Sequence, residues 1–453
     1  MPNSMRSPET ESSRASPPQP FKATIDNCDR EPIHIPGSIQ PLGALVTFEP
    51  GVGSVLHASA NLGDLLPVGP LPVTGRALQD LLGEAAYERV AQAMTGRAGG
   101  PVRHEVVDLP ARPEAGQAQA LEALVHSHGG ICFVEIEPAA APDAGESLQG
   151  LSDTVDAMRS ATGLEDLFHR TALRVKRLTG FDRVMVYRFD EDHHGHVVAE
   201  ARESGMESFL DLHYPASDIP APARELYVSN LVRYIADVGY VPVPVLPCLD
   251  TAGMQPLDMS HAALRSISPM HIQYLRNMGV ASTLVMSLVV EGRLWGLIAC
   301  HHRQPTALPL RLRRACYALA ATAGYMTGWY ASQQRIAASA AAAEAQIQIV
   351  EAFNQVQVPL REVIEHCATP LLKLMGASGG AFWRGDVHIP FGRWPDRARG
   401  DSVLRFVRHG FETSVSHEIS TVQAELQPPL EPGELQEVCG VMALKFDGFA
   451  SCG

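Results

Sequence analysis

The sequence lacks an uninterrupted apolar run long enough to cross a lipid bilayer. The longest candidate, Ala318 to Ala331, contains threonine, glycine and aromatic residues and is flanked by arginine and glutamine, whereas a spanning helix needs about 20 predominantly apolar residues. The first 20 residues are rich in serine and proline and lack the apolar core of a signal peptide. We therefore expect no membrane span, a disordered leader at 1–20 and a cytoplasmic location.

Positive charge is also scarce in the chain. Its 453 residues include 36 Lys and Arg against 50 Asp and Glu, for a net charge of -14, which argues against nucleic-acid binding. The eight cysteines are scattered and form no CxxC pair. We expect free thiols in a reducing compartment.

What the sequence does have is the length and the 45% hydrophobic content of two to four domains. Strand and helix patterns alternate through a first α+β region, which a Pro/Gly-rich linker at 138–145 closes. Its expected strands are 44–48, 54–59, 104–107, 121–125 and 130–136, and its expected helices are 76–82 and 84–94.

A second region opens with one long helical pattern at 151–178 and continues as a sheet with helices on its faces. The expected strands are 183–189, 196–200, 281–290 and 293–301, with helices after the prolines near 220 and at 271–278, and a proline-rich loop at 238–250. A third α+β region covers about 360–449.

A proline-free helical pattern at 310–356 connects the second and third regions. Apolar residues recur along it at steps of four and three, as in a heptad seam: Leu312, Cys316, Leu319, Ala323, Met326 and Tyr330. The seam is compatible with a partner helix at a dimer interface or with packing on its own domain. The length of the run favours the dimer.

The segment YPASDIPAPAREL holds one aspartate at a rigid corner. Pro215 and Pro220 fix the backbone and remove two donors, so Asp218 cannot lie inside an ordinary helix or sheet. Such a corner indicates a binding site, although a helix N-cap would use the same residue type.

Other polar residues are candidates for the same site. Arg233 and Arg265 lie among apolar residues, and a buried arginine needs an anion, from a ligand or from a protein carboxylate. Several tyrosines near these residues suggest a wall for a flat ligand with polar edges: Tyr187, Tyr214, Tyr227 and Tyr274. The histidines of the 193–196 turn lack partners at ligand-like spacing, so we expect no metal site.

Five long motifs resemble those of bacterial phytochromes, the bilin-binding red/far-red photoreceptors. They are CDREPIHIPGSIQPLG, GFDRVMVYRFD, YPASDIPAPARELY, LRSISPMHIQYLRNMGV and LWGLIACHH. The resemblance implies tandem α+β domains, each an antiparallel sheet flanked by helices: PAS at 21–140, GAF at 146–330 and an incomplete PHY at 331–453. It also implies a figure-of-eight knot, in which the segment around Ile39 threads the loop near 242–247.

The resemblance further implies a cofactor, biliverdin IXα, joined by a thioether to Cys28. Arg233, Arg265 and Ser268 would hold its propionates. The Asp218 carboxylate, the Asp218 backbone carbonyl and, through an ordered water, His271 would accept from its pyrrole N–H groups. The tyrosines would surround a D-ring that isomerises in light, and His301 would donate to the carbonyl of that ring. The full expected site is Cys28, Ile39, Tyr187, Tyr214, Asp218, Ile219, Pro220, Tyr227, Arg233, Arg265, Ser268, His271, Tyr274, Thr283 and His301.

The chain departs from the family pattern in two respects. Val285 cannot hydrogen-bond where relatives often carry serine, and no PRxSF tongue motif follows in the third region. We therefore expect impaired or unstable formation of the far-red state. Because no histidine-kinase transmitter is present, we also expect no enzymatic output from this chain. From the connecting helix we expect a homodimer through the GAF and connecting helices. The output partner remains open.

Two other classes of function remain as alternatives. One is a GAF-type sensor of haem or a cyclic nucleotide. Two features of the sequence argue against it: the isolated Cys28 and the absence of a glycine loop that would bind a phosphate. The other is an enzyme with Asp218 and His271 as an acid–base pair, although no nucleophile or oxyanion-hole motif accompanies them.

Overall fold

The computed structural model describes two compact units, Met1–Ala331 and Ser332–Gly453. The described residues are 21, 23–24, 27–95, 102–113, 117, 119–140, 144–247, 256–354, 359–384, 387–394, 397–413, 418–422 and 440–444. The expected leader at 1–20 lies outside the described residues. Most of the chain after 422 also lies outside them, and the expectation of a missing tongue concerns that part.

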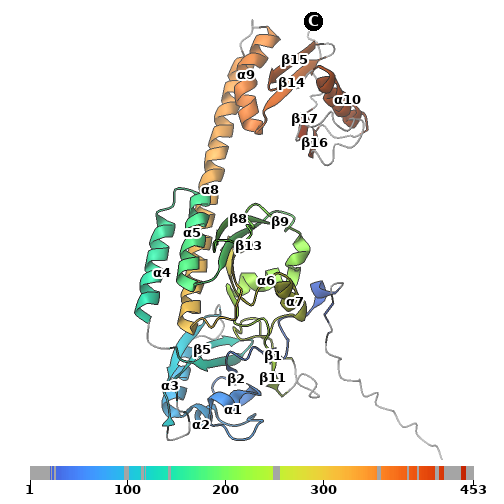
Figure 1. Cartoon of the computed structure of the whole chain (residues 1–453). Coiled ribbons are helices and arrows are strands. Elements are labelled where there is room, and N and C mark those ends of the chain that lie inside the picture. The colour runs from blue at the N-terminus through green and yellow to red at the C-terminus, as the bar shows by residue number, and fades with distance from the viewer. Residues whose placement is uncertain are drawn as a thin grey trace, which may run out of the picture. The chain divides into compact units, whose positions relative to one another are not determined.

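The first unit begins with a seven-stranded antiparallel sheet in the order β1-β11-β3-β2-β6-β5-β4 (Figure 1). Its strands are β1 (Ser38–Ile39), β2 (Ala44–Phe48), β3 (Val55–Ser59), β4 (Glu105–Leu109), β5 (Leu121–His128), β6 (Ile131–Pro138) and β11 (Val243–Leu246). Short helices α1 (Leu62–Leu65), α2 (Leu78–Leu82) and α3 (Glu84–Met94) complete an apolar core on one face. The expected strands and helices of this region are confirmed within a few residues.

Strand β11 corrects the expectation of a loop at 238–250. It lies between β1 and β3, with Val243 opposite Ile39 and Val245 opposite Ser59. Pro244 lacks an N–H, but its carbonyl still accepts from Ala60 at 2.9 Å. Proline therefore removes only one donor from the ladder, and the strand persists. Residues 248–255 lie outside the described residues, so the knot remains a prediction.

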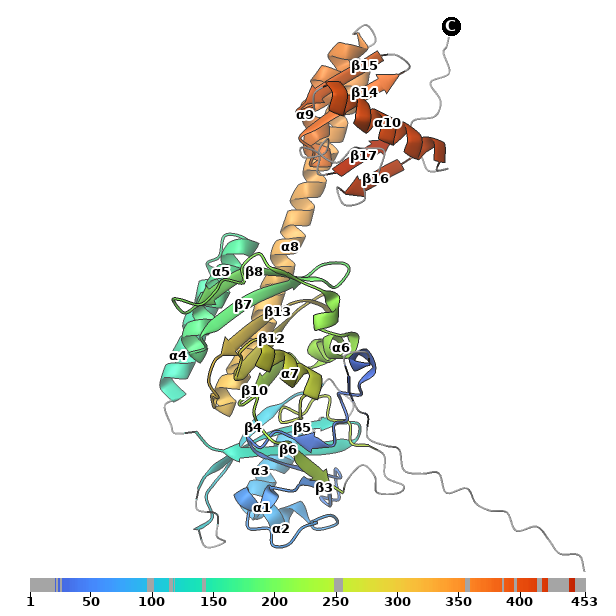
Figure 2. The same ribbon diagram turned by 45° about the vertical axis from the view of Figure 1, so that its right-hand side comes forward.

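A second, six-stranded antiparallel sheet has the order β10-β12-β13-β7-β8-β9. Its strands are β7 (Arg183–Phe189), β8 (Gly195–Arg202), β9 (His213–Tyr214), β10 (Val232–Ile235), β12 (Ser282–Val290) and β13 (Arg293–His302). Helices α4 (Ala144–Arg159), α5 (Leu164–Thr179) and α8 (Leu310–Phe353) pack on one face, while α6 (Ala221–Ser229) and α7 (Pro269–Asn277) lie on the other (Figure 2).

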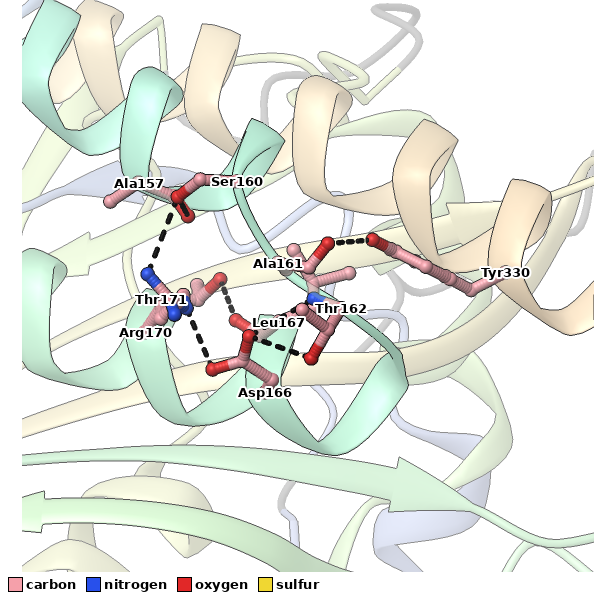
Figure 3. A network of polar contacts seen from close by, with 9 residues as sticks. All are labelled: Ala157, Ser160, Ala161, Thr162, Asp166, Leu167, Arg170, Thr171 and Tyr330. Carbon is pink, nitrogen blue, oxygen red and sulfur yellow. Dashed lines mark hydrogen bonds and ion pairs between the residues drawn. The ribbon is translucent and has the colours of Figure 1, made fainter.

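The expectation of one helix at 151–178 was wrong, because the chain turns between α4 and α5. The Asp166 carboxylate in the first turn of α5 reaches back to accept from the N–H and the hydroxyl of Thr162, at 3.0 and 3.3 Å. The Tyr330 hydroxyl on α8 donates to the Ala161 carbonyl (Figure 3). These contacts satisfy the groups that an uninterrupted helix would have paired internally.

Helix α8 agrees with the expected connecting helix, but the seam predicted for a dimer packs on its own domain. Leu312, Cys316, Leu319 and Ala323 are buried in the core of the second sheet, and Met326 and Tyr330 pack against it. A different face of α8 is exposed, with Tyr325 77% and Trp329 50% accessible.

The second unit is an α+β region, as expected. Its described elements are α9 (Leu360–Met375), β14 (Gly379–Arg384), β15 (Val387–Gly392), α10 (Arg397–Thr413), β16 (Glu418–Val422) and β17 (Gly440–Leu444), in two two-stranded sheets. Ala352 near the end of α8 packs with Val363 and Cys367 of α9. No described helix combines the length and the apolar character needed to cross a membrane.

A buried ion pair joins the first sheet to helix α8, which packs on the second sheet. Arg313 on α8 donates to the Glu137 carboxylate on β6, and each side chain is only 6% exposed. Arg313 also donates to the Leu308 carbonyl at 3.1 Å, so its guanidinium is held from two sides. Loss of one member would leave the other charge buried without compensation.

We therefore predict that Arg313→Ala lowers the free energy of unfolding by about 3 kcal/mol. Urea unfolding followed by circular dichroism measures the change. The matched control is Arg303→Ala, which removes a guanidinium that is 63% exposed. Its partner Asp182 is 14% exposed but still accepts from the backbone N–H of residue 303, so the loss should be no more than about 1 kcal/mol. Equal losses in the two variants would contradict the prediction.

Candidate functional site

One cavity of about 480 Å³ in the first unit is lined by all of the predicted site residues except Ile39. Its size is within the range of sites for small molecules and cofactors, roughly 300–1,000 Å³. Ile39 is fully buried in β1 and pairs with Arg265, so it lies behind the wall and not on it. The structure thus brings together side chains that are up to 273 positions apart in sequence, from Cys28 to His301.

The second sheet supplies one wall because side chains alternate between its faces. Tyr187, Thr283 and His301 face the cavity, whereas Val186 and Leu284, next to Tyr187 and Thr283, belong to the core under the helices. Thr283 and His301 are direct cross-strand partners, and the Thr283 hydroxyl is already donated to the Cys300 carbonyl at 2.9 Å.

Gly195 makes room for the ring of Tyr187. A Cβ atom at position 195 would lie 1.5 Å from Cζ of the tyrosine ring, closer than any side chain permits. The ring of Tyr187 is also 6.1 Å from that of Tyr214, centroid to centroid. A glycine on β8 therefore sets where this aromatic part of the wall can lie.

The proline corner is a short 3-10 turn, Ala216–Asp218, between β9 and α6. The Asp218 carboxylate accepts from the Tyr274 hydroxyl at 3.2 Å, and Arg224 donates to the Ala216 and Ile219 carbonyls. The N-cap of α6 is Pro220, without a capping side chain. The alternative interpretation of Asp218 as a helix cap was therefore wrong, and Asp218 lines the cavity.

The phenols and imidazoles of the cavity are held in their neutral forms. Burial raises the pKa of Tyr187 to about 12, and burial with the nearby Asp218 raises the pKa of Tyr274. Burial lowers the pKa of His271 and His301 to about 4 each, with Arg233 and Arg183 adding to the respective shifts. At neutral pH these side chains are hydrogen-bonding groups without charge.

Arg233 and Arg265 are 9% and 6% exposed. Arg233 donates to the carbonyls of a single segment, those of Ala262, Ala263, Arg265 and Ser266. Arg265 donates to the Ile33 carbonyl, and its Nε is buried without a protein partner among the described residues. Direct pairing with a carboxylate, which the sequence left open, is not seen for either arginine within the described part of the chain.

Sequence reasoning missed Glu31, which also lines the cavity. Ser268 is the N-cap of α7, accepts from Met270 N–H at 3.2 Å and donates to the Glu31 carboxylate at 2.5 Å. Burial raises the pKa of Glu31. Its position three residues after Cys28 was the only signal in the sequence.

Cys28 begins a 3-10 turn, Cys28–Arg30, and is half-buried on the cavity wall. His196, from the histidine-rich turn, stacks on His213 with the ring centroids 4.3 Å apart. The described residues contain no group of three or more side chains that could hold a metal ion.

Comparison with known proteins identifies two domains in the first unit. A PAS fold matches residues 28–139 and a GAF domain matches residues 163–325. The structure is similar to the crystal structure of the chromophore-binding domain of an unusual bacteriophytochrome from R. palustris, with a TM-score of 0.61 and 36% identity over 68% of this chain and 99% of that chain. The cavity therefore belongs to a protein of the PAS–GAF class.

Curated relatives agree with the structural match. The chain is 36% identical over 389 residues to the bacteriophytochrome of Xanthomonas campestris pv. campestris, covering 86% of this chain and 60% of that protein. It is 40% identical over 297 residues to the bacteriophytochrome of Pseudomonas aeruginosa, covering 64% of this chain and 39% of that protein. The chain belongs to the bacteriophytochrome family, and it spans 60% or less of the length of these relatives.

The low pKa of His271 predicts that acid destabilises the fold. The folded value of about 4 lies below the ordinary 6.5, so the unfolded chain binds more protons between these values and stability falls as pH falls through that window. His271→Gln should reduce this slope by up to about 1.4 kcal/mol per pH unit.

Urea unfolding at several pH values between 7 and about 5 measures the slope. His193→Gln, on the exposed turn between β7 and β8, is the matched control for the loss of a histidine. If His271→Gln keeps the wild-type slope, the imidazole is not held neutral by burial.

Proposed function

We propose that this chain is a red/far-red light photoreceptor that binds biliverdin IXα through a thioether to Cys28. The observation that carries the proposal is the convergence of Cys28, two buried arginines, the Asp218 corner and neutral imidazoles on one cavity. Membership of the bacteriophytochrome family supports it. The proposed role is sensory and not catalytic, and a cytoplasmic location stays a prediction.

The lining fits a flat tetrapyrrole with two carboxylates. The Arg265 Nε and the Ser266 hydroxyl are buried without protein partners among the described residues, which supports an anionic group at that side. Ile219, Pro220 and Val285 supply apolar surface for the rings. Bound there, the bilin would supply absorption of red light and isomerisation of its D-ring.

The positions of the chain's own residues around the cavity support the following proposed roles. Arg233, Arg265 and Ser268 would bind carboxylates. The Asp218 carboxylate and the neutral His271 would accept from pyrrole N–H groups. Around the D-ring, four phenols and one imidazole would limit rotation and exclude water: Tyr187, Tyr214, Tyr227, Tyr274 and His301.

The decisive experiment is assembly of the purified chain with biliverdin. We expect a red-absorbing pigment whose colour stays with the acid-denatured chain, since only a covalent adduct survives denaturation. Cys28→Ala should reduce the covalent adduct to background while the folded variant still binds biliverdin reversibly. Zinc-enhanced fluorescence on a denaturing gel measures the adduct, and absorption of the folded protein measures binding.

Cys132→Ala is the matched control, because Cys132 is buried in the core of the first sheet and does not line the cavity. It should keep the adduct. A chain that stays colourless with biliverdin, but binds haem or a cyclic nucleotide, would contradict the proposal and favour the sensor of another small molecule.

We also propose that the chain forms a homodimer through α8. The support is a row of two exposed aromatic side chains on the part of this helix in the first unit, where Tyr325 and Trp329 are 77% and 50% accessible. Their spacing of four residues places them on one side of the helix. Large exposed aromatic residues at such a row are typical of an interface.

We predict that the double variant Tyr325→Glu/Trp329→Glu weakens dimerisation at least about tenfold, because charge replaces apolar contact at the proposed interface. Size-exclusion chromatography with light scattering over a dilution series measures the effect. Gln334→Glu, on the opposite side of the helix at 3.6 residues per turn, is the control. A double variant that remains as dimeric as the control would rule out this face.

A further inference from the structure

A carboxylate of the first sheet holds the segment that carries Arg265. Glu135 on β6 is fully buried. Its two oxygens accept from the backbone N–H groups of Ala263, at 3.0 Å, and Leu264, at 2.6 Å. A carboxylate that accepts two backbone N–H groups is a strong, directional anchor. The side chain lies in the PAS fold, but it acts on the edge of the cavity in the GAF domain.

Arg233 holds the same peptide groups from their other ends. Its Nη1 donates to the Ala262 carbonyl at 3.3 Å and to the Ala263 carbonyl at 3.2 Å. The Ala262 carbonyl and the Ala263 N–H belong to one peptide unit, and the Ala263 carbonyl and the Leu264 N–H belong to the next. Since N–H and C=O point in opposite directions in a trans peptide, each unit lies between the anion of Glu135 and the cation of Arg233.

The arrangement lies in apolar surroundings. Leu45, Phe133 and Leu264 form one buried cluster around it. Low local polarity strengthens a hydrogen-bonded chain of carboxylate, peptides and guanidinium, because little water screens it. Glu135 therefore acts as the counterion of Arg233 through the two peptide groups between them, without direct contact.

Several titratable or charged groups face Glu135. Those on neighbouring elements are His126 on β5, whose Nδ1 is 3.8 Å from a Glu135 oxygen, and Arg233 on β10. Glu137 lies on the same strand. His104 and His261 pack around His126, with ring centroids at 4.6 and 6.4 Å. Burial raises the pKa of Glu135 to about 7, although the two backbone donors oppose the shift.

We propose that Glu135 is a positioning residue for the anion-binding side of the cavity. Through the two peptide units it fixes the guanidinium of Arg233, and with it the following Arg265 and Ser266, in the geometry that accepts a carboxylate. The inference rests on the proposed function, because it assigns Glu135 to recognition of the bilin carboxylates.

The test compares binding of biliverdin and of its dimethyl ester, which lacks the two negative charges. Both are titrated into chains that carry Cys28→Ala, so that binding is reversible, and the readout is the ratio of the two dissociation constants. Glu135→Gln should lower the preference for the free acid by about three- to tenfold, since one charge-assisted acceptor is lost, and leave the affinity for the ester nearly unchanged.

Glu137→Gln is the matched control. It removes a buried carboxylate two residues away on the same strand, but that carboxylate pairs with Arg313 and not with the 262–264 segment. The control should keep the parental ratio. A Glu135→Gln chain with the parental ratio, or with equal losses for acid and ester, would reduce Glu135 to a structural residue and overturn the inference.

A second measurement needs no change at position 135. As the pH falls through about 7, Glu135 takes up a proton, and the preference for the free acid should decline while the bilin carboxylates remain ionised. A flat ratio across this range would also overturn the inference. If the parent chain binds neither compound, the proposed function fails, and the inference fails with it.

Discussion

The cost of burying two guanidinium groups is the constraint on which the site depends. Arg233 and Arg265 are almost fully enclosed, and a cation without compensation in such a place would cost several kcal/mol. Backbone carbonyls of the 262–266 segment and of Ile33 provide most of the compensation. The path of these two backbone segments is therefore set by the charges that they surround, and the cavity wall is set with it.

This constraint explains why the two domains close on each other. The segment after 256 crosses the face of the first sheet. There Leu264 packs with Phe133, and the Glu135 carboxylate accepts from the N–H groups of Ala263 and Leu264. Strand β1 joins the same sheet through β11, which belongs to the chain between β10 and α7. The chain of the second domain thus contributes β11 to the first sheet, and the Ile33 carbonyl of the first domain accepts from Arg265. The positions of the arginines therefore depend on both domains.

The sequence predicted the elements well where one local pattern dominates, as for β7, β8, β12 and β13 of the second sheet and for α8, whereas the short strands β9 and β10 of that sheet were missed. It failed where distant partners decide. The prolines around β11 predict a loop, and the strand forms because it pairs with β1 and β3, which lie about two hundred positions earlier in the sequence. The break between α4 and α5 depends on contacts among Thr162, Asp166 and Tyr330. Site residues were found through motifs. Glu31 lies inside the first motif, but the motif did not indicate a role for it, and Glu135 lies outside all five motifs.

The cavity is divided electrostatically, and this division favours one orientation of a ligand. Besides burial, the charge of Asp218 raises the pKa of Tyr187 and Tyr274, whereas the charge of Arg233 acts on Tyr227 and His271. One side of the cavity is therefore acidic and phenol-rich, and the other is basic. Because the imidazoles and phenols stay neutral at pH 7, they do not blur this separation. A molecule with anionic groups on one edge and N–H donors elsewhere satisfies both sides only when its anions face the arginines.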